Sequence, residues 1–545
     1  MPDPVFPPGP VAAGPVCAGP ASADAVFSGP VAAQPVDAAG RMQAAGLAAG
    51  LFARIAASLG AALLAAACSS LAPPVREPAL DIPQAWPQAG VASQASAQDW
   101  WKMFDDPSLD RMVEEALVHN LDVAAAIFRV EEARALAAAA RADQWFSVQA
   151  TAGASRGRAS ERSATPLPPG VSTIGDRRSI GIEAAYEADL WGRYRDASAS
   201  ARAALAASRY AQAVVRLSVA SQVVQGYFDL RALDAQVELT QRTLRTRKEA
   251  VSLREKRLKG GTGSALDLHQ DQAEAALAEA TLAELSERAS LTGSALAVLL
   301  GRNPRALLEA DIERGKTIDA LAAPPEVPGG LPSQLLARRP DVQQSHALLA
   351  AATAEIGVAR ASYLPSLSLT AAYGGESSAL SDVLTSPARV WLLAAALAAP
   401  LFTAGRADAA VDLANARERE AAVRYEQTAL IAFREVRDAL SRRSWAVSRA
   451  QAQQTRIQAL DNARRLARIR YDSGYSGYLD VLDADRNLFQ SELDRVAARR
   501  DSLVASVDLV KSLGGGWSGL EPPPQAQLTQ TEAQPLPNER TTRSN

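Results

Sequence analysis

Cysteine and histidine are scarce in this sequence. Its 545 residues include two cysteines, Cys17 and Cys68, which both lie within the first 70 positions. A disulfide framework in the body of the chain is therefore excluded, and so is a four-cysteine metal site. The three histidines, His119, His269 and His346, lie far apart in the sequence, and we interpret them as surface or packing residues. We expect neither a metal nor another cofactor.

An excess of charge of one sign is also lacking. The 57 basic and 60 acidic residues leave a net charge of -3, which argues against a nucleic-acid-binding protein, since such proteins normally carry a basic excess or patch. The motifs HExxH, GxxxxGKS/T and GxSxG are missing from the sequence, so we do not expect an enzyme. Aromatic residues make up 5% of the chain, which is few for a large globular core. Abundant Ala, Leu, Arg, Glu and Gln favour long helices instead.

The N-terminal region has the features of a processed secretory leader. Residues 1–40 are rich in Pro, Ala and Gly and contain neither Lys nor Arg. From Ile55 to Ala67 the chain has 13 apolar or small residues, too few to span a bilayer but suited to the apolar part of a signal peptide. We expect that translation starts at Met42, or that residues 1–67 are removed in either case.

A candidate lipid attachment site follows this apolar stretch. The segment LLAAACSS resembles a bacterial lipobox, although Ala65 stands where Leu is preferred and Leu64 lies one position early. We therefore expect Cys68 to be lipidated, with palmitate among its acyl chains. Ser69, rather than Asp, fits sorting to the outer membrane. The alternative is an ordinary secretory signal with an unrelated cysteine.

The rest of the chain contains two copies of one unit. Residues 133–153 are similar to residues 352–372, and the segment that begins at Arg257 recurs at Arg470. A Pro- and Gly-rich segment, PPEVPGGLP, separates the copies. We therefore divide the chain into a leader (1–67), a lipid-anchored strap (68–97), a first repeat (98–305), a linker or equatorial segment (306–332), a second repeat (333–517) and a disordered tail (518–545).

Each repeat is predicted to have the same order of elements: a helix, two strands, a very long helix and a helix of about 35 residues. The long helices cover about 192–258 and 404–471, and a helix of this length is on the order of 100 Å long. In the first of them, apolar residues recur every seven positions, which predicts a coiled-coil seam. The seam residues are Val223, Leu230, Val237, Leu244, Val251 and Leu258. The other predicted helices are 107–142, 264–300, 333–362 and 477–513.

Four strands are predicted, at about 144–154, 178–190, 366–375 and 391–402. The first three alternate between apolar and polar residues and the fourth is apolar nearly throughout, which suits tilted strands of a barrel that crosses a bilayer. Glu183, Glu187 and Asp189 on the polar face suit a water-filled lumen. A soluble, half-buried sheet has the same alternation and is the alternative. Because four strands cannot close a barrel and lipid excludes open edges, we expect several chains to share one barrel.

Seven motifs occur in the order found in one known family. They are YEADLWGR (186–193), GLPSQLLARRPDV (330–342), AEIGVARASYLPSLSLT (354–370), PLFTAGR (400–406), IAFREVRDAL (431–440), RYDSGYSGYLDVLDADRNLF (470–489) and KSLGGGW (511–517). Together they resemble the TolC-like outer-membrane efflux channels. They look most like the NodT-type lipoprotein branch, which serves tripartite multidrug pumps of the resistance-nodulation-division (RND) type. The resemblance covers about residues 98–517.

The resemblance implies a mainly α-helical fold with a small transmembrane β part. Three chains would form a homotrimer, whose 12-stranded β-barrel in the outer membrane continues into a 12-helix α-barrel in the periplasm. The loops at 157–177 and 377–390 would face the outside. The trimer would be a passive exit duct for drugs and other small molecules. An inner-membrane RND-type pump would supply them through a periplasmic adaptor (membrane fusion) protein.

Two other functions compete with this interpretation. An outer-membrane duct for type I protein secretion belongs to the same structural class, and the lipobox with the GLPS-LL-RRPD segment favours drug efflux over it. A periplasmic coiled-coil lipoprotein with a structural role is the alternative from a different class.

The resemblance also implies functional positions at the ends of the helix pairs. The glycine-rich turns would be periplasmic tips that contact the adaptor, through Gly261, Thr262, Gly263, Gly474, Tyr475 and Gly477. Asp480 and Asp483 share a helix face and match the aspartates of the channel constriction, where three chains would bring six carboxylates together. From the residues alone, the turns suit any helix hairpin, and the two aspartates suit the start of any helix.

A latch at the entrance is implied as well. Tyr471 matches the family tyrosine that links the inner helix to an aspartate, here Asp267, and this pair would help to hold the entrance shut. Ser476 occupies the position of the arginine that joins this network in the family, so we expect a latch of different construction. Trp191 and Phe402 are predicted to end strands where the barrel meets the helices.

Lipid attachment at Cys68 can be tested by metabolic labelling. The wild-type chain should incorporate labelled palmitate and Cys68→Ser should not, because the thiol is the attachment site. Cys17→Ser, a change within the predicted leader, should leave the label unaffected. An unlabelled wild type, or a labelled Cys68→Ser variant, would identify the leader as an ordinary secretory signal.

Overall fold

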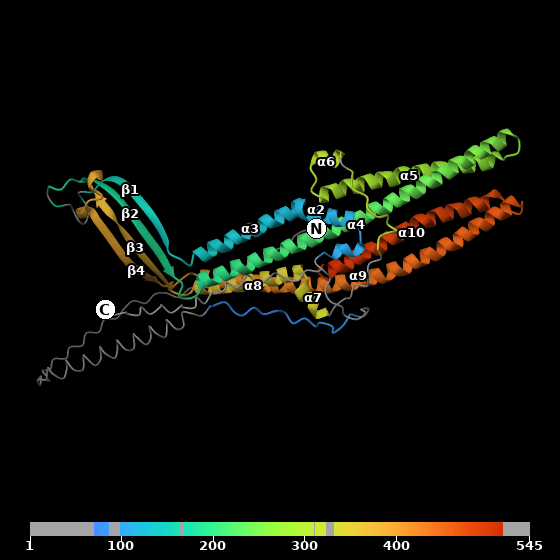
Figure 1. Cartoon of the computed structure of the whole chain (residues 1–545). Helices are drawn as coiled ribbons and strands as arrows, with labels where there is room; N and C mark the ends of the chain where they lie inside the picture. The colour runs from blue at the N-terminus through green and yellow to red at the C-terminus, as the bar shows by residue number, and fades with distance from the viewer. Residues whose placement is uncertain are drawn as a thin grey trace, which may run out of the picture. The chain divides into compact units, whose positions relative to one another are not determined.

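The computed structural model describes residues 70–86, 99–160, 162, 168, 170–309, 311–322 and 332–515 (Figure 1). Cys68, the predicted leader and the predicted tail lie outside these residues. The described chain is mainly helical with one small sheet, as predicted. None of its described helices combines the length and the apolar character that crossing a bilayer requires.

The helices and strands follow the order predicted for two repeats. They are η1 (Trp100–Phe104), α2 (Pro107–His119), α3 (Leu121–Ala142), β1 (Ser147–Arg158), β2 (Ile174–Ala188), α4 (Arg193–Lys259), α5 (Ala265–Leu299), α6 (Pro304–Glu309), α7 (Pro332–Arg338), α8 (Pro340–Ala361), β3 (Ser366–Ser377), η2 (Leu380–Asp382), η3 (Ser386–Ala388), β4 (Arg389–Ala398), α9 (Arg406–Asp472) and α10 (Tyr478–Ser512).

The lengths of matching elements confirm the internal repeat. α4 and α9 have 67 residues each, and α5 and α10 have 35 each. Both pairs start 213 residues apart. α3 and α8 have 22 residues each, β1 and β3 have 12 each, and these pairs start 219 residues apart. The first repeat is therefore six residues longer between its first strand and its long helix.

The first helix of each repeat is interrupted, although we predicted continuous helices over 107–142 and 333–362. Asn120 has φ -63° and ψ 133°, and its side-chain oxygen accepts hydrogen bonds from two backbone amides in the first turn of α3. It therefore ends α2 and caps α3. In the second repeat Pro340 begins α8, and a proline ring disfavours helical backbone at the preceding residue, here Arg339. Both breaks thus have a local cause in the backbone.

The sheet is antiparallel in the order β1-β2-β3-β4, so β1 and β4 form its two edges. Val148 of β1 lies opposite Ala184 of β2. Ala184 lies opposite Ala371 of β3, which in turn lies opposite Leu393 of β4. Because directly opposed residues share a face, this register gathers apolar positions of all four strands on one face, in agreement with the predicted alternation.

Two predicted strand ends are wrong. β2 ends at Ala188 and β4 ends at Ala398, so Trp191 and Phe402 lie beyond the strands. Trp191 instead donates a hydrogen bond of 2.7 Å from Nε1 to the backbone oxygen of Pro365, just before β3. Apolar sequence continues past the end of β4 but the ladder of paired residues does not, and composition alone does not report where backbone pairing stops.

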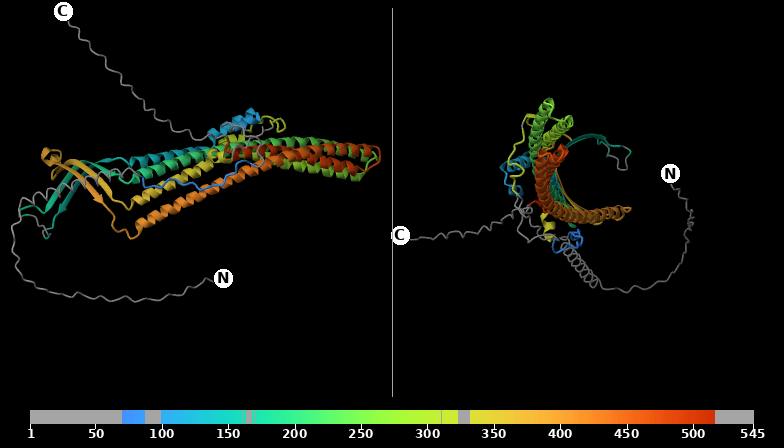
Figure 2. Two further views of the ribbon diagram at one scale, coloured as in Figure 1. Left: turned by 90° about the horizontal axis from the view of Figure 1, so that it is seen from below. Right: turned by 90° about the vertical axis from the view of Figure 1, so that its right-hand side faces the viewer.

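The helices contact one another in two sets that share α4 and α9 (Figure 2). On the side of the sheet the contacts follow the order α3, α4, α8, α9, and towards the other end they follow the order α5, α4, α10, α9. α3 and α9 are therefore the edges of the set next to the sheet. Residues 70–86 run beside this set, where Ser70 Oγ donates to Asp196 Oδ1 at 2.5 Å and the rings of Trp86 and Phe433 lie 5.8 Å apart.

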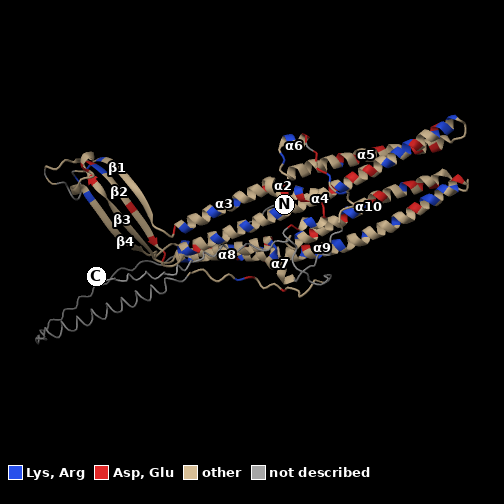
Figure 3. Ribbon diagram, viewed as in Figure 1, with Lys and Arg blue, Asp and Glu red and all other residues tan. Residues whose placement is uncertain are grey.

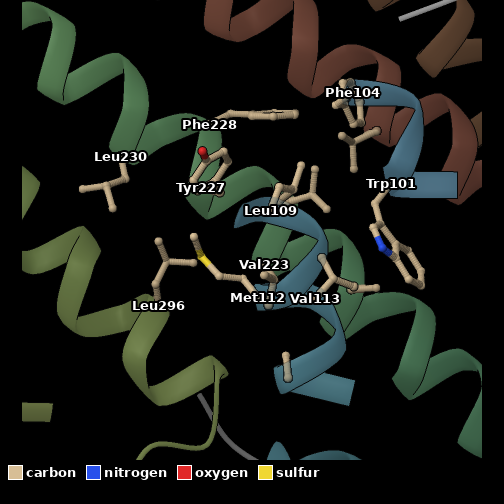
Figure 4. Close-up of a cluster of buried hydrophobic side chains, with 14 of the residues drawn as sticks. Trp101, Phe104, Leu109, Met112, Val113, Val223, Tyr227, Phe228, Leu230 and Leu296 are labelled. Atoms are coloured by element: carbon tan, nitrogen blue, oxygen red, sulfur yellow. The ribbon is translucent and has the colours of Figure 1, made fainter. Parts of the chain in front are cut away.

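The main apolar core surrounds the middle of α4, and Tyr227 and Phe228 are among its fully buried side chains (Figure 4). Tyr227 Oη donates a 2.5 Å hydrogen bond to Asp106 Oδ2. Burial, together with this bond, raises the pKa of Tyr227 well above its usual range, so the phenol stays protonated. Its oxygen also accepts a bond from Gly315 N at 3.1 Å, which fastens residues 311–322 to the long helix.

The predicted seam of α4 packs against other helices. Val223 and Leu230 are fully buried, and the other four seam residues are buried or half-buried. Towards the end of α4 that is remote from the sheet, Val237 packs against a cluster that includes Leu285 of α5 and Phe489 of α10. A 67-residue helix thus has partners along its length, which it needs because most helix stability in proteins comes from packing of an apolar face.

Candidate functional site: the tips of the helix pairs

The two helix pairs end in the same kind of turn. Gly261, after α4, has φ +75°, and Gly474, after α9, has φ +73°. In both turns the following amide donates to a carbonyl oxygen five residues earlier, at 3.0 Å from Thr262 and 2.8 Å from Tyr475. Residues with a side chain adopt this left-handed backbone only at a cost, so the turn geometry accounts for both glycines.

The predicted adaptor-contacting positions lie at these turns, at the end of the helices remote from the sheet (Figure 1). Gly263 is half-buried, and the other five positions are exposed: Gly261, Thr262, Gly474, Tyr475 and Gly477. The aromatic ring of Tyr475 is the largest of these exposed groups. The turns are therefore accessible to a partner in the isolated chain.

Arg254, near the end of α4, connects the two helix pairs. Its Nη1 donates to Tyr471 Oη at 3.0 Å, and its Nε donates to Asp271 Oδ2 at 3.2 Å. Its Nη1 also lies 3.7 Å from Asp267 Oδ2, and its guanidinium lies 4.0 Å from the ring centre of Tyr478. Tyr478 Oη in turn donates to Asp271. One cation therefore contacts residues of α5, α9 and α10.

Burial makes this cluster dependent on its pairing. The side chain of Asp271 is 4% exposed and that of Arg254 is 12% exposed. Burial lowers the pKa of Arg254, but hydrogen bonding with Tyr471 and Tyr478 outweighs this effect and raises the pKa above its usual range. Burial, together with the bond to Asp271, raises the pKa of Tyr478 to about 12. At neutral pH the guanidinium is charged and the phenol is protonated, as the hydrogen bonds require.

A second charged group lies one helical turn further from the tip. Glu274 of α5 is 4% exposed and lies 3.0 Å from Arg247 of α4. It also accepts a hydrogen bond from Arg486 of α10. The Arg247 guanidinium lies 5.2 Å from the ring centre of Phe489, also in α10. Because a buried carboxylate without a partner would be strongly destabilising, these two arginines hold α4, α5 and α10 in one arrangement.

The predicted constriction residues begin a polar stripe on α10. Asp480 and Asp483 are both exposed, and spacings of three and four residues continue the stripe through Asn487, Gln490 and Asp494. Asn487 Nδ2 donates to Asp483 Oδ2 at 3.2 Å, and Gln490 Nε2 donates to Asp494 Oδ1 at 2.9 Å. The carboxylates of Asp480 and Asp483, near the tip, are therefore accessible on this side of the helix.

The predicted latch residues, Tyr471 and Asp267, both contact Arg254, a residue that we did not predict from the sequence. At Ser476, which we predicted to replace the family arginine, the hydroxyl is buried and has no hydrogen-bond partner in the described chain. The arginine of this cluster thus enters from α4 rather than from the turn. A signal was available in the spacing, because Arg254 lies five residues before the end of α4 and Asp271 lies six residues after the start of α5, so the two face each other across the hairpin.

A family model described as outer membrane efflux protein matches residues 112–302 and 331–515, and so covers both repeats. The chain belongs to this family. It is an efflux channel protein of the outer membrane, and the proteins of this family are channels rather than enzymes.

Relatives with curated names agree with this assignment. The efflux channel is 33% identical over 464 residues to the probable efflux pump outer membrane protein TtgC of Pseudomonas putida, which covers 82% of this chain and 93% of TtgC. It is 33% identical over 457 residues to the cation efflux system protein CusC of Escherichia coli, which covers 82% of this chain and 96% of CusC.

Solved structures show the same fold. The CmeC outer membrane channel of Campylobacter jejuni matches with a TM-score of 0.79 at 26% identity, over 83% of the efflux channel and 96% of CmeC. The open state of the MtrE outer membrane channel of Neisseria gonorrhoeae matches with a TM-score of 0.74 at 28% identity, over 82% and 98% of the two chains.

Arg254→Gln should loosen the tip while leaving the rest of the chain intact. The change removes charge-assisted bonds worth about 2 kcal/mol, so amide hydrogen exchange in both turns should become roughly 30-fold faster. Arg257→Gln is the control, because Arg257 is exposed in the same stretch of α4. Equal exchange rates in Arg254→Gln and wild type would show that Arg254 does not hold the two helix pairs together.

Proposed function

We propose that three copies of this efflux channel assemble into one exit duct, with a shared 12-stranded β-barrel and a shared 12-helix α-barrel. The position of β1 and β4 at the edges of the sheet carries this proposal. The outer side of each edge strand has no strand partner among the described residues, and every unpaired backbone group costs several kcal/mol in lipid. Pairing β1 of one chain with β4 of the next removes both edges and keeps all neighbours antiparallel.

Apolar residues at the edges of the helical set support the same assembly. On α3, Val123 and Val130 are buried within the chain, whereas Phe128 lies on the opposite side of the helix and is 66% exposed. On α9, Val436 is buried, whereas Leu430 lies about 120° away around the helix and is 58% exposed. Apolar side chains at both edges suit contact between α3 of one chain and α9 of the next.

The assembly can be tested on protein extracted from the outer membrane in mild detergent. Native mass spectrometry should give the mass of three chains, and the same material should form pores in planar bilayers. Phe128→Glu should strongly reduce the trimer fraction, because it places a charge in the contact between helices. Leu308→Glu changes an 84% exposed residue of α6 and should leave the trimer intact. A monomer without pore activity would contradict the proposal.

We further propose that Asp480 and Asp483 form a constriction of six carboxylates in the trimer. Their exposure and their place at the start of the polar stripe support this role, and so does the match to the family aspartates. Such a ring attracts cations and opposes the passage of anions. In the same region the Arg254 cluster, with Tyr471 and Asp267, acts as the latch that holds the helix pairs of each chain together.

The double variant Asp480→Asn with Asp483→Asn tests the constriction. It removes six negative charges from the trimer, so the concentration of a trivalent cation that halves the single-channel current should rise on the order of tenfold. Asp472→Asn, which removes an exposed carboxylate at the end of α9, should change this concentration little. Unaltered block in the double variant would rule out the ring.

The duct needs partners that supply its substrate. The exposed turns at Gly261 and Gly474 suit contact with a periplasmic adaptor, and an inner-membrane RND-type pump would provide the energy. Relatives are named for the efflux of toluene and of cations and for the export of pyoverdine, which are small solutes. These names favour drugs and other small molecules over type I secreted proteins for this channel. Lipidation at Cys68 would anchor the N-terminal strap beside the barrel.

A further inference from the structure

Arginines gather at the end of the sheet that is remote from the helices. Charged residues follow the helices along their whole length, whereas the strands are mostly uncharged (Figure 3). The strand ends next to the loops are an exception, because Arg156 and Arg158 end β1 and Arg389 begins β4. Arg178 lies five residues into the strand formed by residues 174–188, at the same end of the sheet.

The register puts these four arginines on the apolar face. Arg178 lies opposite Ala154 and Arg156 lies opposite Asp176, two and four positions beyond the pair of Ala152 with Ile180 on the same strands. A step of two along a strand keeps the face. Arg389 lies opposite Gly375, two positions beyond the pair of Tyr373 with Trp391, and so shares the same face of β3 and β4. Arg158 shares it by the same two-residue step from Arg156.

Aromatic and aliphatic residues fill this face below the arginines. Tyr373 and Trp391 form a cross-strand pair, and Trp391 is 73% exposed. From Ile180 to Ala188 the face extends about 20 Å across a membrane, at ~3.3 Å per residue and a tilt of ~40°. Aromatic residues are typical of the membrane boundary, and arginine on the lipid face is tolerated there but not at mid-depth. The arginines therefore lie at the level of lipid headgroups.

On this face and at this end, the described strands supply four arginines and one carboxylate. Arg178 also donates a hydrogen bond to the backbone oxygen of Ser378. Asp176 is the one carboxylate among the described strand residues of this face at this end, and its Oδ1 lies 3.6 Å from Arg156 Nε. Arg177 points to the opposite face, where it pairs with Glu376 at 2.6 Å. Arg156 keeps a side chain that is 74% exposed in spite of its pairing. The lipid face therefore carries more arginine than carboxylate at the headgroup level.

We propose that these arginines bind the phosphate groups of the glycolipid in the outer leaflet of the outer membrane. The proposal rests on the trimeric barrel proposed above, in which the apolar face contacts lipid and the loops face outside. Guanidinium groups bind phosphate with two parallel hydrogen bonds, which a neutral headgroup does not offer. Three chains bring twelve arginines to the rim of the barrel. The channel is thereby fixed in depth by its upper rim.

Native mass spectrometry of the detergent-extracted channel tests this inference with two probes, diphosphoryl lipid A and the same lipid without its phosphates. Wild type should bind the phosphorylated form at least about tenfold more tightly. The triple variant Arg156→Gln, Arg178→Gln, Arg389→Gln should lose this binding on the order of a hundredfold, at about fivefold for each arginine near an anionic surface. Arg177→Gln changes the neighbouring residue on the opposite face and should bind like wild type.

Conductance in bilayers of phosphatidylcholine, which lack the probe, tests the exit duct separately from the binding of lipid A. Pores formed by wild type and by the triple variant, together with the loss of lipid A binding in the variant, support the inference. Equal binding of both lipids by a conducting wild type overturns the inference and leaves the exit duct standing. A wild type that neither assembles nor conducts overturns both. If the triple variant fails to fold, the comparison of the two lipids on wild type still decides.

Discussion

The unpaired backbone groups at the two edges of the four-stranded sheet are the constraint on which the rest of this molecule depends. In water an open edge is a tolerable liability, but in lipid each unpaired amide and carbonyl costs several kcal/mol. The sheet order leaves β1 and β4 with one neighbour each, and in the proposed trimer copies of the chain share those edges. Phe128 of α3 and Leu430 of α9 are exposed apolar residues at the edges of the helical set, and the same assembly would cover them. The edges of the sheet and the edges of the helical set thus both favour the proposed trimer.

The remote ends of the helices are governed by a different constraint. Arg254, Asp271 and Glu274 are charged side chains removed from water, and burying an ion pair brings little net stability because desolvation offsets the attraction. Breaking such a pair is nevertheless costly, so the pairs act through specificity: they favour one arrangement of α4, α5, α9 and α10 over other packings of similar apolar area. A tip that is held partly by such charges can be reorganised by a partner that offers competing charges.

Much of the fold could be predicted from local sequence, because long stretches without Pro or Gly and a seven-residue seam specify long helices directly. The predicted bounds of α4 and α9 differ from the observed ones by one or two residues. The break at Pro340 was also visible in the sequence, since a proline restricts the residue before it. The ends of the strands were not visible in the sequence, because the apolar residues continue to Phe402 whereas the pairing of β4 with β3 ends at Ala398. Arg254 was missed because its partners come from three other helices, and a pattern along one helix does not report them.

In the proposed duct, selectivity would come from charge rather than from shape. Relatives named for the efflux of toluene, cations and pyoverdine share this fold, so a passage that serves solutes of such different size is not built as a fitted pocket. The stripe from Asp480 to Asp494 carries carboxylates and amides at three- and four-residue spacing. Such groups would act on the charge of a solute and would not enclose it in a pocket of matching shape. On the lipid side of the proposed barrel, the apolar residues would place the sheet in the membrane, and the arginines at its rim would set its depth. In the proposed assembly, charged residues near the two ends of the described chain thus act on passage and on depth in the membrane, and the apolar parts between them form the walls.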